Sequence, residues 1–376
     1  MGCVVAFVRE TIPKASRMKA FVLTDIPSPY QVELFNEISA QKTLDLSVAY
    51  LRNSDPARSW QPAAAAYDCR SVGESSASFT EAARLAAEAD VAIFNYYNHP
   101  LAERLIQRRA ETGRPWCFWG ERPGFRRPRF ASRLLRKWKL KTLRRSCAPI
   151  WGIGEFALQE YKHEFGAERL YRNVPYFSDL DRFKAARAER KERTRTERVF
   201  LFCGSFTMRK GVDLVARAFV RLAREVPQVR LVIAGEGVLK ESIARTLQPV
   251  QNQVEFVGFK HWDELPELYA AADVLCVPSR YDGWGLVVPE GLAAGLPVIA
   301  TDRMGAGLEF VRNGINGWLI AAGEEETVLA AMRAAAILTD TELAQAGHDA
   351  QRSVREHTLA HGAARFASYA REAANV

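Results

Sequence analysis

The sequence lacks the features that mark membrane-spanning, disulfide-stabilised and metal-binding proteins. In its 376 residues, no apolar run reaches the roughly 18 residues that a membrane-spanning helix requires. The six cysteines lie far apart and form no Cys-x-x-Cys pair, which is typical of reduced thiols in a cytosolic protein. No acidic cluster stands out as a metal site. We therefore expect a cytoplasmic protein without a resident metal.

The N-terminus also lacks a clear targeting signal. A short apolar run is soon followed by charge, which argues against a cleaved signal peptide. The Met-Gly-Cys start lacks the hydroxyl residue that a myristoylation motif requires, because Ala6 stands at that place. Met18 directly precedes the first strand-like run, so either Met1 or Met18 could be the true start, with residues 1–17 as a leader.

What the chain does have is a regular alternation of short apolar runs and longer amphipathic runs. Hydrophobic residues make up 48% and charged residues 26%, which are globular values, and the length predicts two domains. Such alternation predicts parallel sheets covered by helices on both faces. A polar, Arg-rich stretch at 184–198 interrupts it and is interpreted as a charged surface segment at a domain boundary. We predict an α/β protein of two doubly wound halves that face each other, with ligands at the carboxyl ends of the strands.

The first strand end with a chemical signature follows the run "VFLFC" and reads "GSFTMRKGVDLV". Gly204 and Ser205 predict a tight turn, and Arg209 and Lys210 open the next helix. Backbone N–H groups, a helix N-terminus and two cations suit a pyrophosphate. The alternative is that Lys210 is an ordinary surface lysine and Gly211 a turn residue.

Three further glycine-rich segments follow strands. "GEGVLK" places Gly235 and Gly237 where the backbone could approach a flat ligand, although no third glycine completes a dinucleotide fingerprint. "GFK" follows the next strand-like run. "TDRMGAGLEFV" places Gly305 and Gly307 at a helix start, which is a second candidate phosphate cradle.

Two carboxylates, Asp282 and Glu290, flank the carboxyl end of a strand predicted at 274–278. The segment 279–287 is predicted to be a loop, Pro289 the first helical residue, and Glu290 part of the first turn. Asp282 could be a simple turn residue, and Glu290 could simply complement the helix dipole. Their shared position at a strand end favours a ligand-binding role instead.

An ordered series of motifs carries a family resemblance: "GSFTMRKGVDL", "VIAGEG", "VEFVGF", "LYAAADVLCVPSRYDGWGLVVPEGLAAGLPVIATD" and "EFVRNGINGWLI". Together they resemble the retaining, nucleotide-sugar-dependent glycosyltransferases of the family 4 type, also called glycosyl transferases group 1. The resemblance covers most of 199–320 and is weaker in "TDIPSPYQVELFNEIS" and "WGIGEFALQEYKHEFG". It implies the GT-B fold, with two facing Rossmann-like domains and a cleft between them. The implied parts are an acceptor-side domain at 18–176, a linker at 177–198, a nucleotide-sugar-binding domain at 199–355, and a C-terminal helix at 356–376 that packs back on the first domain.

The resemblance also implies roles for individual residues. Lys210, helped by Arg209, would hold the donor diphosphate, Glu290 would bind the ribose hydroxyls, and Asp282 with residues 283–285 would face the sugar. The implied donor-binding set is Gly204, Ser205, Arg209, Lys210, Gly235, Gly237, Phe259, Asp282, Gly283, Trp284, Gly285 and Glu290, and the implied catalytic set is Asp282, Glu290, Lys210 and Glu121. Two positions depart from the family pattern, because Ser205 replaces an arginine and Asp282 replaces a glutamate.

The expected reaction is a retaining transfer by front-side attack, in which the protein stabilises charge on the leaving diphosphate. The resemblance implies a UDP- or GDP-sugar as donor, no cofactor and no metal, and a glycan or lipid-linked acceptor in lipopolysaccharide or exopolysaccharide synthesis. On the acceptor side, Glu121 is preferred over His99, since a lone histidine after a strand is more often structural. The alternatives are a non-catalytic nucleotide-sugar sensor or scaffold, a nucleotide-sugar epimerase, and a phosphorylase, which would need a longer chain. A glycosidase with Asp282 and Glu290 as its acid and base is rejected, because the surrounding loops fit phosphate and ribose.

The basic excess, a formal net charge of +8, concentrates at 121–145. Phe130, Leu134 and Trp138 recur every four residues, beside Leu135, among many cations. Such a helix is a candidate for an anionic membrane surface through 126–145, placing the protein on the inner face of the cell membrane. Alternatively, the apolar stripe packs on the sheet and the cations are solvated. Nucleic-acid binding is disfavoured, because no recognised nucleic-acid module is present.

Overall fold

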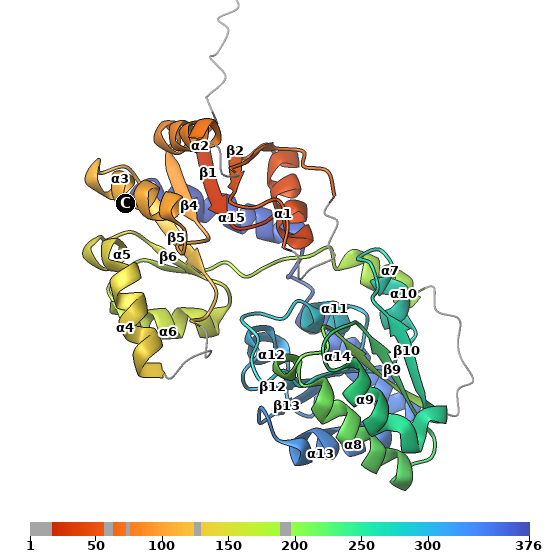
Figure 1. The fold of residues 1–376 in the computed structure, drawn as a ribbon. Coiled ribbons are helices and arrows are strands. Elements are labelled where there is room, and N and C mark those ends of the chain that lie inside the picture. Colours follow the sequence, from red (N-terminus) through yellow and green to blue (C-terminus); the bar gives the residue numbers. More distant parts are fainter. Residues whose placement is uncertain (1–16, 56–62, 73–75, 124–128, 189–196) are drawn as a thin grey trace, which may run out of the picture.

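The computed structural model describes residues 17–55, 63–72, 76–123, 129–188 and 197–376. They form two α/β domains, one with a seven-stranded sheet and one with a six-stranded sheet (Figure 1). Every strand pair in both sheets is parallel. The predicted fold class of two doubly wound halves is therefore confirmed.

The N-terminal sheet has the strand order β3-β2-β1-β4-β5-β6-β7. Its strands are β1 (Lys19–Thr24), β2 (Asp45–Tyr50), β3 (Asp68–Ser71), β4 (Val91–Phe94), β5 (Trp116–Gly120), β6 (Ile150–Gly152) and β7 (Tyr171–Asn173). Its helices are α1 (Pro29–Ala40), α2 (Ser76–Glu88), α3 (Pro100–Glu111), α4 (Arg129–Lys139), α5 (Lys141–Arg145) and α6 (Glu155–Phe165). The central strands β4 and β5 are buried along their whole length, as expected for strands covered on both faces.

The C-terminal sheet has the order β10-β9-β8-β11-β12-β13. Its strands are β8 (Arg198–Cys203), β9 (Val229–Ala234), β10 (Val254–Gly258), β11 (Val274–Val277), β12 (Val298–Thr301) and β13 (Gly317–Ile320). The helices are α7 (Asp181–Ala188), α8 (Val212–Glu225), α9 (Lys240–Leu247), α10 (Leu265–Ala270), α11 (Val287–Ala293), α12 (Gly305–Phe310), α13 (Glu325–Ala336), α14 (Asp340–Ser353) and α15 (Leu359–Ala373), with 3₁₀ turns η1 (Met208–Lys210) and η2 (Gln248–Gln253). In each sheet, the strands that follow the first strand are added on one side of it, and the later strands are added on its opposite side. The strand order therefore reverses between β1 and β4 and between β8 and β11, and these two places are the topological switch points.

Two segments differ from the sequence-based expectation. Helix α7 covers only the first part of the Arg-rich stretch, and residues 189–196 lie outside the described residues. Pro289 is the third residue of α11 rather than the first, since the helix already begins at Val287. A proline is tolerated there because the first N–H groups of a helix have no intrahelical partner.

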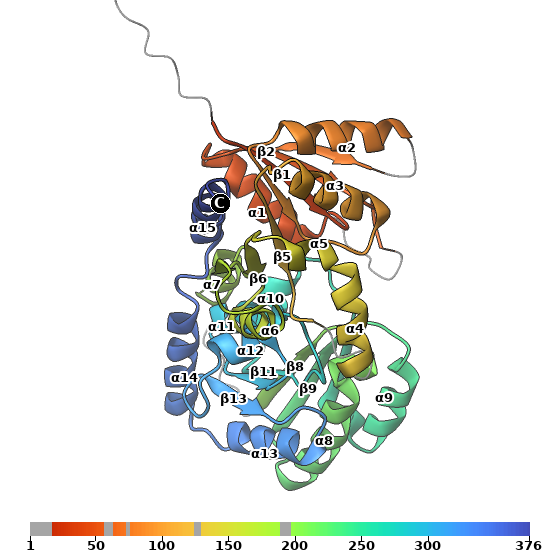
Figure 2. The same cartoon turned by 90° about the vertical axis from the view of Figure 1, so that its left-hand side faces the viewer.

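The last helix, α15, crosses from the C-terminal domain and packs against α1 of the N-terminal domain (Figures 1 and 2). Its Phe366 makes edge-on ring contacts with Phe35, Trp119 and Trp151, at centroid distances of 6.2, 5.7 and 5.1 Å. All four side chains are buried. The N-terminal core is thus completed by the end of the chain.

We expect Phe366→Ala to lower the free energy of unfolding of the N-terminal domain by about 3–5 kcal/mol, because it leaves a cavity among three large aromatic rings. Urea denaturation followed by tryptophan fluorescence measures this effect directly, since Trp119 and Trp151 touch the substituted ring. Phe256→Ala, at an exposed position of β10, is the matched control and should change stability little. Equal unfolding midpoints for Phe366→Ala and the control would contradict this packing.

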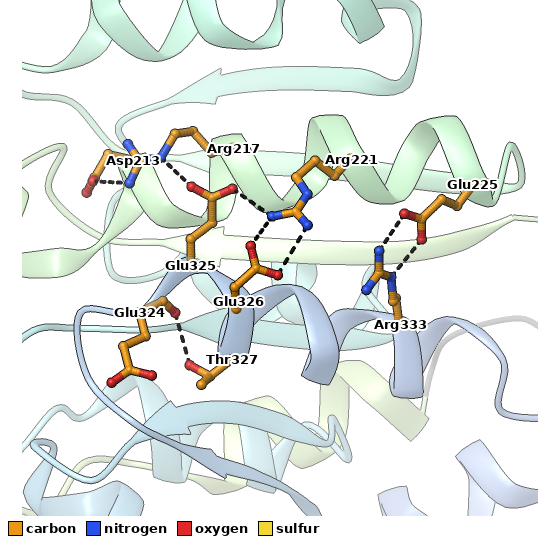
Figure 3. A network of polar contacts seen from close by, with 9 residues as sticks. All are labelled: Asp213, Arg217, Arg221, Glu225, Glu324, Glu325, Glu326, Thr327 and Arg333. Atoms are coloured by element: carbon orange, nitrogen blue, oxygen red, sulfur yellow. Dashed lines mark hydrogen bonds and ion pairs between the residues drawn. The ribbon is translucent and has the colours of Figure 1, made fainter.

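Helices α8 and α13 lie side by side and are joined by a surface ladder of ion pairs (Figure 3). The pairs are Arg217–Glu325, Arg221–Glu325, Arg221–Glu326 and Arg333–Glu225. Exposed pairs of this kind each contribute less than about 1 kcal/mol. The ladder ends at Asp213, which also binds Arg280 beside the candidate site.

Helix α4 does not pack its apolar stripe on the sheet. The side chains of Leu134, Leu135 and Trp138 are 61%, 42% and 66% exposed. The side chain of Phe130 lies outside the described residues. Arg136 is not solvated either, because it binds the buried Glu164 at 3.0 Å. The alternative in which the stripe packs on the sheet is therefore wrong.

Candidate functional site

The predicted site residues gather at the switch point of the C-terminal sheet. The loop after β8 carries Gly204 and Ser205, and the loop after β11 carries Asp282. Strands β8 and β11 are hydrogen-bonded neighbours, so the two loops start side by side. This is the edge at which doubly wound sheets bind ligands.

Arg209 and Lys210 lie in the 3₁₀ turn η1, which is held in place by hydrogen bonds from Arg280. The Arg280 guanidinium donates to the Met208 carbonyl at 2.6 Å and makes two 2.7 Å bonds to Asp213. The turn ends at Gly211, whose φ of 74° is left-handed. A Cβ there would lie 2.1 Å from the Pro278 carbonyl oxygen, so the loop can pass close to β11 only with glycine at this position.

Lys210 and Asp282, to which the resemblance gives the donor diphosphate and the sugar, form an ion pair. The Lys210 Nζ lies 2.5 Å from Asp282 Oδ2, and Arg209 Nη1 lies 3.5 Å from the same oxygen. Burial would raise the pKa of the Asp282 carboxyl, but the two cations outweigh burial and hold this pKa below its usual value. The site is therefore a preformed cluster of two cations and one carboxylate.

Glu290 is buried on α11, with 1% of its surface exposed. Its Oε2 accepts a 3.2 Å hydrogen bond from the Tyr269 hydroxyl, whereas its Oε1 is buried and has no hydrogen-bond partner. Burial raises the pKa of the Glu290 carboxyl to about 7, against the opposing influence of Arg182 and Tyr269. A buried carboxylate oxygen without a donor is unfavourable, and it suits a ligand that brings hydroxyl groups.

Gly235 and Gly237 allow the loop after β9 to pack closely on the loop after β8. A Cβ on Gly235 would lie 2.0 Å from the Gly204 carbonyl oxygen, and a Cβ on Gly237 would lie 2.7 Å from that of Phe206. These glycines therefore permit close packing on the loop after β8, and their contact with a ligand stays a prediction. Phe259, on the next loop, is half-exposed and stacks edge-on with His261.

The second candidate phosphate cradle, at Gly305 and Gly307, is already occupied by protein backbone. The N–H groups of Gly305 and Ala306 donate to the carbonyl oxygens of Asp282 and Trp284. These two donors at the start of α12 hold the loop after β11 and do not face a phosphate. That prediction is wrong for these N–H groups.

Trp284 belongs to the predicted donor-binding set, but its indole is buried at the domain boundary. A Cβ on Gly154, in the N-terminal domain, would lie 2.7 Å from the indole ring, and Phe310 packs edge-on at 5.8 Å. The ring thus packs against the other domain, while its buried Nε1 has no hydrogen-bond partner, and its donor-binding role stays a prediction. Gly285, the next residue, has a left-handed φ of 89° that turns the loop.

On the acceptor side, the structure brings Glu121 to the predicted donor site. A Cβ on Gly283 would lie 2.3 Å from Glu121 Oε2, and the Tyr281 hydroxyl donates to the Arg122 carbonyl at 2.9 Å across the domain boundary. His99 instead caps α3, with its Nδ1 accepting from the Leu101 N–H at 3.2 Å. The histidine is a helix cap.

Sequence reasoning missed a contact that joins the two domains beside Glu290. Glu33, on α1, accepts a 2.8 Å hydrogen bond from the Trp262 indole and pairs with Arg182 at 3.1 Å. The Arg182 guanidinium also stacks on Trp262 at 4.4 Å. No periodicity could reveal this contact, because its members come from α1, α7 and the loop before α10.

Within the described ranges, no three or more His, Cys, Asp or Glu side chains are grouped so that they could hold a metal ion. The five cysteines in these ranges are free, and only Cys117 and Cys276 are buried. No helix in the described part of the chain is both long enough and apolar enough to cross a bilayer.

The C-terminal domain, which carries these site residues, resembles known proteins in sequence. Residues 184–352 match the family model described as "Glycosyl transferases group 1". This group 1 segment begins in α7, contains β8 to β13, and includes Lys210, Asp282 and Glu290.

Two curated relatives indicate how far the likeness reaches. The chain is 34% identical, over 168 residues, to a GDP-mannose-dependent α-(1-6)-phosphatidylinositol monomannoside mannosyltransferase of Mycobacterium tuberculosis. The match covers 41% of this chain and 44% of that protein. The chain is also 26% identical, over 195 residues, to the α-D-kanosaminyltransferase of Streptomyces kanamyceticus. This second match covers 49% of this chain and 50% of that protein. The chain thus spans about half or less of the length of the curated relatives it matches.

Solved structures extend the likeness in fold to nearly the whole chain. The structure of Anabaena HepE in complex with UDP superposes with a TM-score of 0.74 at 17% identity, covering 94% of this chain and 100% of that one. WaaG, described as a glycosyltransferase involved in lipopolysaccharide biosynthesis, superposes with a TM-score of 0.67 at 16% identity. That superposition covers 93% of this chain and 99% of WaaG. The fold is GT-B, with both domains included.

Proposed function

We propose that the protein is a retaining glycosyltransferase that moves a sugar from a UDP- or GDP-sugar to a glycan or lipid-linked acceptor. The observation that carries the proposal is the buried Glu290 oxygen without a donor, beside the cations Lys210 and Arg209 at one switch point. A nucleoside diphosphate sugar supplies the complementary groups, since its ribose brings hydroxyl donors and its diphosphate brings negative charge. The group 1 match and the mannosyltransferase relatives support the same substrate class.

In the proposed reaction the donor diphosphate competes with Asp282 for Lys210. Once released from the ion pair, the Asp282 carboxylate accepts hydrogen bonds from the sugar. The bond between the anomeric carbon and the diphosphate breaks, and the acceptor oxygen bonds to that carbon on the same face. The acceptor proton passes to the leaving phosphate oxygen. Lys210 and Arg209 stabilise the charge that develops on the leaving group, which is where a preformed cation contributes most to rate.

Glu121 is proposed to bind the acceptor, because its carboxylate reaches the loop at Gly283 from the N-terminal domain. The acceptor is proposed to be a lipid-linked or surface glycan at the cytoplasmic face of the membrane. WaaG, described as a glycosyltransferase involved in lipopolysaccharide biosynthesis, shares the fold and supports this choice.

The Lys210–Asp282 ion pair also favours a second candidate, a sensor that binds a nucleotide sugar without transferring the sugar. A cation already neutralised by a carboxylate has less charge to offer the leaving group. Incubation with UDP- and GDP-sugars, followed by detection of released UDP or GDP, separates the two candidates. A transferase releases nucleotide slowly by hydrolysis and faster with an acceptor. Binding without release supports the sensor, and absence of binding contradicts both candidates.

The exposed stripe on α4 is proposed to rest on an anionic membrane. Of its three exposed apolar side chains, Trp138 lines a small hollow of about 90 Å³ together with the cations Lys139 and Lys141. Apolar contact and cations together are what surface-bound helices use.

Trp138→Ala should weaken binding to phosphatidylglycerol vesicles by about 10- to 100-fold, because insertion of one large apolar side chain contributes about 1.5–3 kcal/mol. Co-sedimentation with the vesicles measures this binding. Ile337→Ala removes an equally exposed apolar side chain from the C-terminal domain and should leave binding unchanged. If both variants bind like the parent, the stripe does not carry membrane contact.

A further inference from the structure

The surroundings of Glu290 contain a buried tyrosine that neither the motifs nor the proposed reaction employs. Tyr269 lies on α10 and is completely buried. Its ring packs edge-on against Phe183 of α7 at 5.2 Å. Its hydroxyl donates to Glu290 Oε2 at 3.2 Å and lies near the Cys203 side chain.

These contacts connect three elements of the candidate site. Cys203 is the last residue of β8 and directly precedes Gly204 in the loop with the two cations. Glu290 lies on α11, after the loop that carries Asp282. The Tyr269 hydroxyl therefore links the end of one site strand to the carboxylate that follows the other.

The two oxygens of the Glu290 carboxylate are consequently not equivalent. Oε2 is occupied by Tyr269, whereas Oε1 has no hydrogen-bond partner. A carboxylate held at one oxygen cannot rotate freely, so the direction of the other oxygen is fixed before any ligand arrives. Such preorganisation avoids an ordering penalty on binding.

We infer that Tyr269 is a positioning residue for the donor nucleotide: its hydroxyl binds one oxygen of Glu290, so that Oε1 is presented to the ribose hydroxyls. This inference rests on the proposed function, since it requires a ribose at Glu290. It adds the residue that orients the carboxylate. Tyr269 itself touches no substrate.

The test compares a nucleotide that has ribose hydroxyls with one that lacks them. Calorimetric titration of the parent with UDP and GDP first identifies the nucleotide that binds. Its 2′,3′-dideoxy analogue is then titrated into the parent, Tyr269→Phe and Tyr171→Phe. Tyr171 is the matched control, because it is a buried tyrosine of the N-terminal sheet whose hydroxyl donates to the Gly166 carbonyl, remote from Glu290.

Tyr269→Phe should weaken binding of the hydroxyl-bearing nucleotide about tenfold and leave the dideoxy analogue unchanged, because only the ribose contact is disordered. Tyr171→Phe should change neither. Equal weakening of both nucleotides by Tyr269→Phe would show general damage to the site and overturn the inference, as would no weakening of either. A parent that binds neither UDP nor GDP would overturn the proposed function as well, so the two failures are distinguishable.

Thermal unfolding verifies that Tyr269→Phe is folded. If it is not, Tyr269→Met is the second variant, since a methionine can fill the space of the ring in a buried site but has no hydroxyl to offer Glu290. The same selective loss for the hydroxyl-bearing nucleotide supports the inference. Affinities equal to those of the parent overturn it.

Discussion

Lys210→Ala is expected to lower kcat for sugar transfer by about 100- to 1000-fold, the range typical of removing one preformed group that stabilises transition-state charge. The Lys210 Nζ is the cation nearest to Asp282 Oδ2, and Arg209, at 3.5 Å from that oxygen, is more exposed. Arg209 can bind a diphosphate, but it cannot fully replace a half-buried cation in a site with restricted water access. The measurement is steady-state kinetics with the nucleotide sugar that the protein hydrolyses or transfers.

The variant also leaves Asp282 without its closest cation, so folding and chemistry have to be separated. Lys162→Ala, on the exposed face of α6, is the matched control and should retain parental kinetics. Thermal unfolding with and without nucleotide shows whether the site is intact. If a folded Lys210→Ala protein retains the parental kcat, the assignment of the donor diphosphate to Lys210 is wrong.

Glu290→Gln is expected to weaken nucleotide binding by about 10- to 100-fold and to remove its pH dependence. In the free parent the pKa of the Glu290 carboxyl is raised to about 7 by burial, so below that pH the side chain is mostly protonated. The ionised form is the better acceptor for two ribose hydroxyls. Affinity in the parent should therefore rise as pH increases through about 7 and level off above it, whereas Glu290→Gln should give a flat profile.

The same pKa predicts the pH dependence of stability. Between about pH 4.5 and 7 the folded protein retains a proton on Glu290 that the unfolded chain has released, so the contribution of this group to stability falls as pH rises through this window. The charged and titratable groups that face Glu290 are Arg182, Glu33, Lys210, Tyr269 and Cys203. Glu290→Gln should abolish that slope, whereas Glu225→Gln, at an ion pair exposed on α8, should not. A parental pH profile in Glu290→Gln would contradict the assignment.

The sequence predicts the fold well because the strands are short apolar runs buried on both faces. β4, β11 and β12 are buried at every position, and such runs are recognisable without an alignment. β3 was missed because it is a polar strand at the sheet edge, with no buried residue. An edge strand that faces solvent has no apolar pattern to reveal it.

The candidate site is predicted in part, and the limit is side-chain direction. Lys210, Asp282 and Glu290 are visible because they follow strands and carry charge. Nothing in their spacing predicts that Lys210 and Asp282 form an ion pair. Nor does an apolar helix such as "LPELYA" show where the Tyr269 hydroxyl points. The sequence shows that the backbone at Gly235 and Gly237 is free to adopt unusual conformations. Only the structure shows that these glycines allow close packing on the loop after β8.

The most direct test of the account is a crystal structure of the protein with the nucleotide that it binds, UDP or GDP. We expect the diphosphate to contact Lys210 and Arg209, and the Lys210–Asp282 ion pair to be broken. We also expect the ribose hydroxyls to lie within hydrogen-bond distance of Glu290 Oε1. Nucleotide bound away from β8 and β11, or a ribose directed away from an unchanged Glu290, would contradict it.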